Sequence, residues 1–185
     1  MNTNNSTDRF VQNTSLVFLL NDLYRSEIVL TEALTKMSVA ASSPQLAGAF
    51  NVHQTETREQ DRRLRDILKT VLNGQQSEGT ADEMGQTSVS PLVAQGETII
   101  NTMQAGPERD EALVAAARQV EQHEIAGYSD AIRMSRDEGV SAAVVAQLEK
   151  TLGEEQHALS TLNSLAGTRA ENNTERLAGR NAEVY

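Results

Sequence analysis

Hydrophobic and polar residues alternate along most of this chain with the three- and four-residue spacing of amphipathic helices. Strong helix formers dominate the composition, and each of the three prolines stands where a helix can begin. Ser43 and Ser90 precede two of these prolines and can cap a helix, and Gly139 marks a further break. The pattern predicts long helices over residues 8–41, 43–73, 107–137 and 141–166, and a shorter one over 90–104.

The four long segments have lengths that are ordinary for a four-helix bundle. Between the second and third of them, residues 74–88 form a loop rich in Gly, Ser, Gln and Thr, which the shorter helix follows. This long connection indicates a crossover rather than a tight turn. We therefore predict an all-α four-helix bundle over residues 1–167, with a short extra helix in the crossover connection. Residues 168–185 are expected to be a polar C-terminal tail that is frayed or ordered only against a partner.

Composition excludes several kinds of function. The net charge of −10 argues against a protein that binds nucleic acid through its phosphates. The absence of cysteine excludes disulfides and thiolate metal ligands. No apolar run reaches the ~18–20 residues that cross a membrane, and the polar N-terminus lacks the apolar region of a signal peptide. We expect a cytoplasmic protein with neither a nucleic acid nor a membrane as its partner.

Charged residues stand on or beside the apolar faces (seams) of the predicted helices, at similar positions along the bundle. They are Glu27 in the first long helix, His53 and Glu56 in the second, Glu121 and Glu124 in the third, and Glu155 in the fourth. Burying an ionised carboxylate without a partner destabilises a fold by on the order of several kcal/mol. Stability alone therefore does not explain why all four helices carry a carboxylate at a similar level on or beside the buried face.

A pair of metal cations would supply the missing positive charge. Carboxylate oxygens together with an imidazole suit iron or manganese, and zinc is a further alternative. His53 and Glu56 have the i, i+3 spacing found in dinuclear carboxylate sites, in reversed order. Glu154 and His157 have the direct Glu-x-x-His spacing but lie off the seam. The sequence leaves open whether this second pair replaces Glu155 as a ligand or joins it.

Each of these positions also has a plain structural interpretation, because a single Glu on a helix is usually solvated. The off-seam His123 is expected on the surface. Tyr24 and Tyr128 lie close enough in sequence to hydrogen-bond the ligands, but they fit half-buried bundle aromatics equally well.

Three stretches carry a resemblance to a known family. They are residues 18–57 (FLLNDLYRSEIVLTEALTKMSVAASSPQLAGAFNVHQTET), 109–128 (RDEALVAAARQVEQHEIAGY) and 148–162 (LEKTLGEEQHALSTL). Together they resemble the YciF/YciE family of ferritin-like stress proteins over roughly residues 8–166. The resemblance implies a ferritin-like bundle, a dinuclear metal centre and a homodimer. It places Glu27, His53, Glu56, Glu121, Glu124 and Glu155 at the family's candidate metal positions.

The chain departs from the family pattern at two places. Gln122 and His123 stand where the family has His-Tyr, and Leu159 stands where members often have Asp. If that Asp helps to hold a metal, ligation by the fourth helix is weaker here or shifted toward His157.

The leading hypothesis is a ferritin-like protein with a dinuclear iron or manganese carboxylate site that reduces peroxide or oxygen in stress protection. Whether it turns over a substrate as an enzyme is left open. The alternative is a metal-independent structural or interaction bundle that acts through dimerisation or a protein partner. An iron-storage cage is disfavoured, because it needs a closed shell of many subunits.

Overall fold

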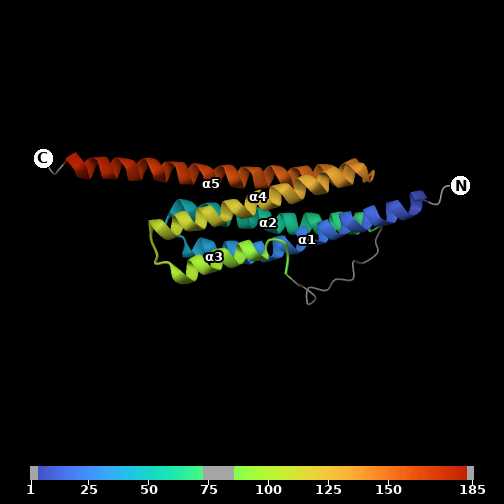
Figure 1. Cartoon of the computed structure of the whole chain (residues 1–185), viewed down its shortest axis with the longest axis horizontal. Coiled ribbons are helices and arrows are strands. Elements are labelled where there is room, and N and C mark those ends of the chain that lie inside the picture. Colours follow the sequence, from blue (N-terminus) through green and yellow to red (C-terminus); the bar gives the residue numbers. More distant parts are fainter. Residues whose placement is uncertain (1–3, 73–85, 183–185) are drawn as a thin grey trace.

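The computed structural model describes residues 4–72 and 86–182, with the side chains of residues 15–72 and 86–166. Within these ranges the chain is all-helical. Its helices are α1 (Asn4–Ala40), α2 (Pro44–Val71), α3 (Ser90–Thr102), α4 (Pro107–Asp137) and α5 (Ala142–Ala182). The four long helices run side by side, and α3 lies in the connection between α2 and α4 (Figure 1). The predicted all-α bundle with a short helix in its crossover is confirmed.

The helix ends agree with the sequence pattern at most positions. Helix α1 begins earlier than expected, and α5 continues to Ala182 and past the neighbouring helices (Figure 1). Most of the predicted loop over 74–88 lies outside the described residues, as do the side chains of the predicted tail. The boundary between a bundle over 1–167 and a tail over 168–185 therefore stays a prediction. In the described part of the chain, no helix combines the length and hydropathy needed to cross a membrane.

Local chemistry explains where the helices begin and end. The hydroxyl of Ser43 caps α2 by accepting a hydrogen bond from the backbone N–H of Leu46 (3.4 Å). At the other end of the bundle, Gly139 has a φ of 70°, a left-handed conformation that glycine adopts without strain. The N–H of Val140 then bonds back to the carbonyl of Ser135 (2.8 Å), which closes α4.

The long helices form two hairpins that face each other. Helix α1 packs most extensively against α2, and α4 against α5, while α3 lies against α1 and α4. Asp110, fully buried in the first turn of α4, fastens the two hairpins together. Its carboxylate accepts hydrogen bonds from the backbone N–H groups of Ser42 (2.8 Å) and Ser43 (2.9 Å) in the α1–α2 turn.

Two apolar clusters fill the ends of the bundle, and a smaller third cluster of Leu30, Val89 and Val120 lies beside its polar middle. Buried leucines Leu16, Leu20, Leu23, Leu64 and Leu148 belong to one cluster. Leu34, Leu46, Phe50, Leu113 and Leu162 belong to the other. Between them lie buried charged and polar side chains from all four long helices. This midsection is the candidate functional site.

Candidate metal centre

Four buried side chains converge in the middle of the bundle. His53 comes from α2, Glu121 and Glu124 from α4, and Glu155 from α5. One potential ligand atom from each lies within 4.8 Å of those of the other three. Glu121 and Glu124 share a face because they are separated by one helical turn. The arrangement brings nitrogen and oxygen donors to one point, as a metal ion requires.

His53 is surrounded by carboxylates. Its Nε2 atom lies 3.2 Å from Oε2 of Glu121 and 3.6 Å from Oε2 of Glu155. Its Nδ1 atom lies 3.6 Å from Oε2 of Glu56, a distance too long for a hydrogen bond. Glu56 sits at the edge of the site, since 31% of its side chain is exposed, compared with 2% for Glu121.

Glu27 of α1 is fully buried beside this group. The hydroxyl of Tyr128, which is also fully buried, donates a hydrogen bond to Oε1 of Glu27. Helix α4 reaches α1 here because residue 127 is glycine. A Cβ atom at Gly127 would lie only 2.9 Å from Cδ2 of Leu23, so a larger residue would force Leu23 to move. The close approach of the two helices thus accompanies the contact between Tyr128 and Glu27.

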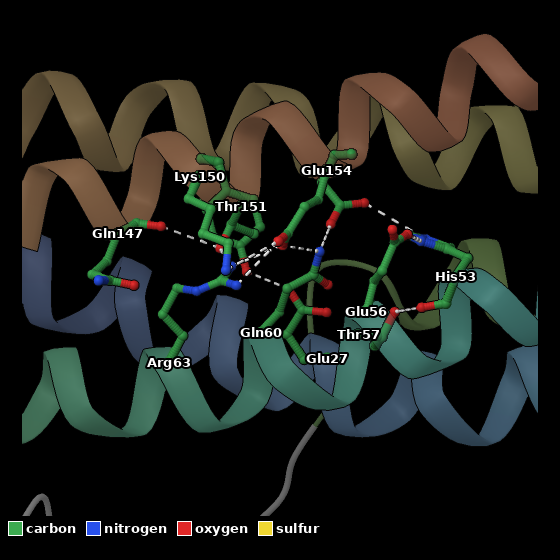
Figure 2. Close-up of polar contacts among 12 residues, drawn as sticks. Glu27, His53, Glu56, Thr57, Gln60, Arg63, Gln147, Lys150, Thr151 and Glu154 are labelled. Atoms are coloured by element: carbon green, nitrogen blue, oxygen red, sulfur yellow. Dashed lines mark hydrogen bonds and ion pairs between the residues drawn. The ribbon is translucent and has the colours of Figure 1, made fainter.

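Gln60 orients the carboxylates of α5 and was not assigned a role from the sequence. Its Nε2 atom donates to Oε1 of Glu155 and to Oε2 of Glu154 (3.2 Å). Arg63, one turn further along α2, donates to both oxygens of Glu154 (2.8 and 3.1 Å), so Gln60 and Arg63 both reach from α2 to α5 (Figure 2). A polar residue on the seam of α2 was the available signal for Gln60. Its partners depend on how α2 and α5 pack.

The buried carboxylates keep oxygen atoms without a hydrogen bond in the described part of the chain. These atoms are Oε2 of Glu27, Oε2 of Glu121, Oε1 of Glu124 and Oε2 of Glu155. Buried polar atoms in folded proteins are nearly always hydrogen-bonded, so four such oxygens in one site are exceptional. Hard oxygen donors with one imidazole fit iron or manganese, and the residues present therefore suit a metal ion.

The electrostatics of the site also indicate missing positive charge. Burial raises the pKa of Glu27 to about 8, although the hydrogen bond from Tyr128 works in the opposite direction. Burial, with Glu27 and Glu155 nearby, raises the pKa of Glu124 well above its usual range. Burial likewise raises the pKa of Glu155. For His53, burial lowers the pKa, but the carboxylates led by Glu121 outweigh it and raise the pKa overall. Without a cation, these raised pKa values favour the protonated forms of the groups in the site.

The six residues expected as ligands divide into three groups. His53, Glu121, Glu124 and Glu155 form the compact cluster, and Glu27 lies buried beside it. Glu56 stands at the half-exposed edge, next to His53. Whether each of them binds a metal stays a prediction.

The weaker candidates lie outside the cluster. Glu154 is ion-paired with Arg63, and His157 is exposed, so Glu155 is the member of α5 that enters the buried group. His123 is exposed, as expected, and its Nε2 atom lies 2.9 Å from the hydroxyl of Ser88.

Of the two tyrosines considered from the sequence, Tyr128 contacts the site. Tyr24 instead lies under the guanidinium of Arg65, which is 5.8 Å from the ring centre.

Comparison with known proteins shows the family to which this chain belongs. A family described as a domain of unknown function, DUF892, matches residues 13–175. Protein YciF of Escherichia coli strain K12 is 31% identical over 150 residues, which span 81% of this chain and 87% of YciF. The chain belongs to the YciF-like DUF892 family.

Solved structures agree with this assignment. The crystal structure of the E. coli stress protein YciF matches this DUF892 chain with a TM-score of 0.75 and 28% identity, over 86% of this chain and 97% of that one. YcfI from Rhodopseudomonas palustris matches with a TM-score of 0.72 and 29% identity, over 82% and 92% of the two chains. The resemblance expected from the sequence motifs is confirmed.

Proposed function

We propose that this DUF892 protein binds a pair of metal ions, iron before manganese, in its polar midsection and reduces a small oxidant there. The observation that carries the proposal is the set of four buried carboxylate oxygens without a hydrogen bond in the described part of the chain. A purely structural bundle gains little from such atoms, because each lacks a hydrogen bond among the described residues and only the oxygens of Glu121 and Glu155 have His53 there as an ion-pair partner. Metal ions would satisfy all of them at once. The role in stress protection is proposed from the likeness to YciF.

The protein's own residues would hold and orient the ligands. Tyr128 and Gln60 each donate to one oxygen of a carboxylate, Glu27 and Glu155 respectively, and leave the other oxygen free to face a cation. The apolar clusters at both ends limit the water that reaches the site. A reduced metal pair, when bound, supplies the two electrons that convert peroxide, with two protons, into two molecules of water.

The direct test is metal analysis of the full-length protein purified without chelator, followed by removal of the metal and anaerobic titration with Fe(II). We expect two ions per chain and consumption of one peroxide per reduced pair. Glu124→Gln should lower the number of ions bound, because it removes a charged donor from the cluster. Glu111→Gln, an exposed position on the same helix, is the matched control and should bind as the wild type does.

One combination of results would contradict the proposal. If neither iron, manganese nor zinc binds with stoichiometry, and Glu124→Gln behaves like Glu111→Gln, the metal-independent bundle is the better account. The homodimer implied by the family resemblance stays a prediction, which light scattering of the same samples tests.

A further inference from the structure

A pocket between α2 and α5 reaches the candidate metal centre from the side. His53 and Glu121 line its inner part, Glu56 stands at its half-exposed edge, and His157 lies along its α5 wall. Its volume is about 190 Å³. A second cavity, under α3, also touches His53 and Glu121, but its volume is only about 20 Å³, which is room for about one water-sized molecule. Of these two cavities, the α2–α5 pocket is the one that can admit a larger ligand.

The inner end of the pocket offers two polar atoms that can form further hydrogen bonds, although one of them, Oε2 of Glu121, lies 3.2 Å from Nε2 of His53. Nδ1 of His53 and Oε2 of Glu121 are buried and form no hydrogen bond in the described part of the chain. The exposed fractions of their side chains are 8% and 2%. A hydroxyl, which both donates and accepts hydrogen bonds, can pair with either atom.

The walls of the pocket are mostly apolar, with Thr161 and His157 as polar lining residues on α5. Phe50, Val52 and Leu162 line it together with Ala49 and Ala158. The volume of about 190 Å³ is room for several water-sized groups. Against the apolar part of these walls, the polar atoms of an extended polar ligand would have no partner. The shape and lining of the pocket therefore fit a ligand with a compact alkyl body and one polar head.

We propose that the α2–α5 pocket binds a small molecule with a hydroxyl or hydroperoxyl head and a compact alkyl body of about four carbons, its head toward His53 and Glu121. The inference deepens the proposed function and rests on it, because it places an organic hydroperoxide or its alcohol beside the site proposed for the metal. The pocket itself is tested without any metal.

The first experiment uses tert-butanol, which does not react, as the probe in saturation-transfer NMR on the metal-free full-length protein. We expect saturable binding of tert-butanol. Methyl tert-butyl ether, which lacks the donor, should bind about fivefold more weakly. Ala49→Leu should weaken tert-butanol binding by about fivefold or more by filling the pocket. Ala47→Leu, also half-buried on α2 but outside the pocket, should leave binding unchanged.

A second pair of variants guards against misfolding. Val52 lines the pocket but is 61% exposed, so Val52→Asp should fold normally and still weaken tert-butanol binding. Val39→Asp, at an 82% exposed position outside the pocket, is its control. Absence of saturable binding, wild-type affinity in folded Val52→Asp, or an ether that binds as well as the alcohol would overturn the proposal.

Loading the protein with Mn(II) separates this inference from the proposed function. A paramagnetic ion in the cluster should broaden the tert-butyl resonance of the bound alcohol. If the alcohol binds with the expected variant pattern but is not broadened, the metal assignment fails and the pocket remains. If the protein binds Mn(II) stoichiometrically but no alcohol, the proposed function stands and the pocket assignment fails.

Discussion

Glu124 combines full burial with a carboxylate oxygen that has no hydrogen bond among the described residues. Such a group weakens the metal-free fold, because it is desolvated and lies among other carboxylates. Glu124→Gln should therefore leave the metal-free protein as stable as the wild type, or more stable by up to about 2 kcal/mol. Urea denaturation in the presence of chelator measures this difference.

Leu30→Ala is the reference for that experiment. Leu30 is a buried apolar residue on the seam of α1, and its truncation should lower the free energy of unfolding by roughly 2–5 kcal/mol. If Glu124→Gln destabilised the metal-free protein as much as Leu30→Ala, Glu124 would be a structural residue.

Glu27 gives the metal-free protein a pH dependence of known sign. Its pKa is about 8 in the folded protein and 4.5 as an ordinary Glu, so the folded state holds this proton more tightly. The stabilisation is complete below about pH 4.5 and is lost as the pH rises to about 8. Denaturation of the metal-free protein should show a lower free energy of unfolding at about pH 9 than at about pH 6.

Substitution at Glu27 isolates its share of this effect. Glu27→Gln should reduce the decline in stability between the two pH values, because the amide does not titrate. Glu32→Gln, whose side chain is 74% exposed in the wild type, should retain the full decline. A wild type whose stability rises over this interval would contradict the assignment.

At the scale of the helices, Asp110 joins α4 to the α1–α2 turn. Asp110→Ala leaves the N–H groups of Ser42 and Ser43 without their acceptor. We expect a loss of roughly 1–3 kcal/mol in the free energy of unfolding, measured by urea denaturation. The neighbouring exposed Glu111→Gln should change stability by less than about 0.5 kcal/mol. Equal losses in the two variants would show that the bonds to the turn do not matter.

The helices were predictable from sequence because their ends are marked locally. Ser43 caps α2 and Gly139 closes α4, and neither effect depends on distant residues. Apolar periodicity then identified the buried face of each helix, which is why Glu27 and Glu155 were expected in the interior and are buried there.

The sequence could not predict which residues at the edges of that face are more buried. Glu56 and Glu121 both lie beside a seam, but Glu121 is buried against His53 and Glu56 remains half-exposed. The difference depends on how the neighbouring helices pack, which the spacing of residues within one helix does not contain. The contact between Gln60 and Glu155 escaped prediction for the same reason, because it depends on the register of α2 against α5.

At the scale of the whole molecule, metal binding should increase the stability of the folded state. A ligand at 100 times its dissociation constant stabilises the folded state by about 2.7 kcal/mol. Adding Mn(II) to the metal-free protein should raise its melting temperature, and chelator should reverse the change. The shift should be smaller in Glu124→Gln. An identical shift in that variant would place the bound ion elsewhere.

The division of the cluster between two hairpins has a kinetic consequence. The α1–α2 hairpin carries Glu27 and His53, and the α4–α5 hairpin carries the remaining buried carboxylates. Neither hairpin alone presents the complete set of donors, so a cation would bind tightly only after the two have docked. Interactions that form after the folding barrier slow unfolding and leave the folding rate nearly unchanged. A bound metal would thus prolong the lifetime of the native protein without hastening its formation.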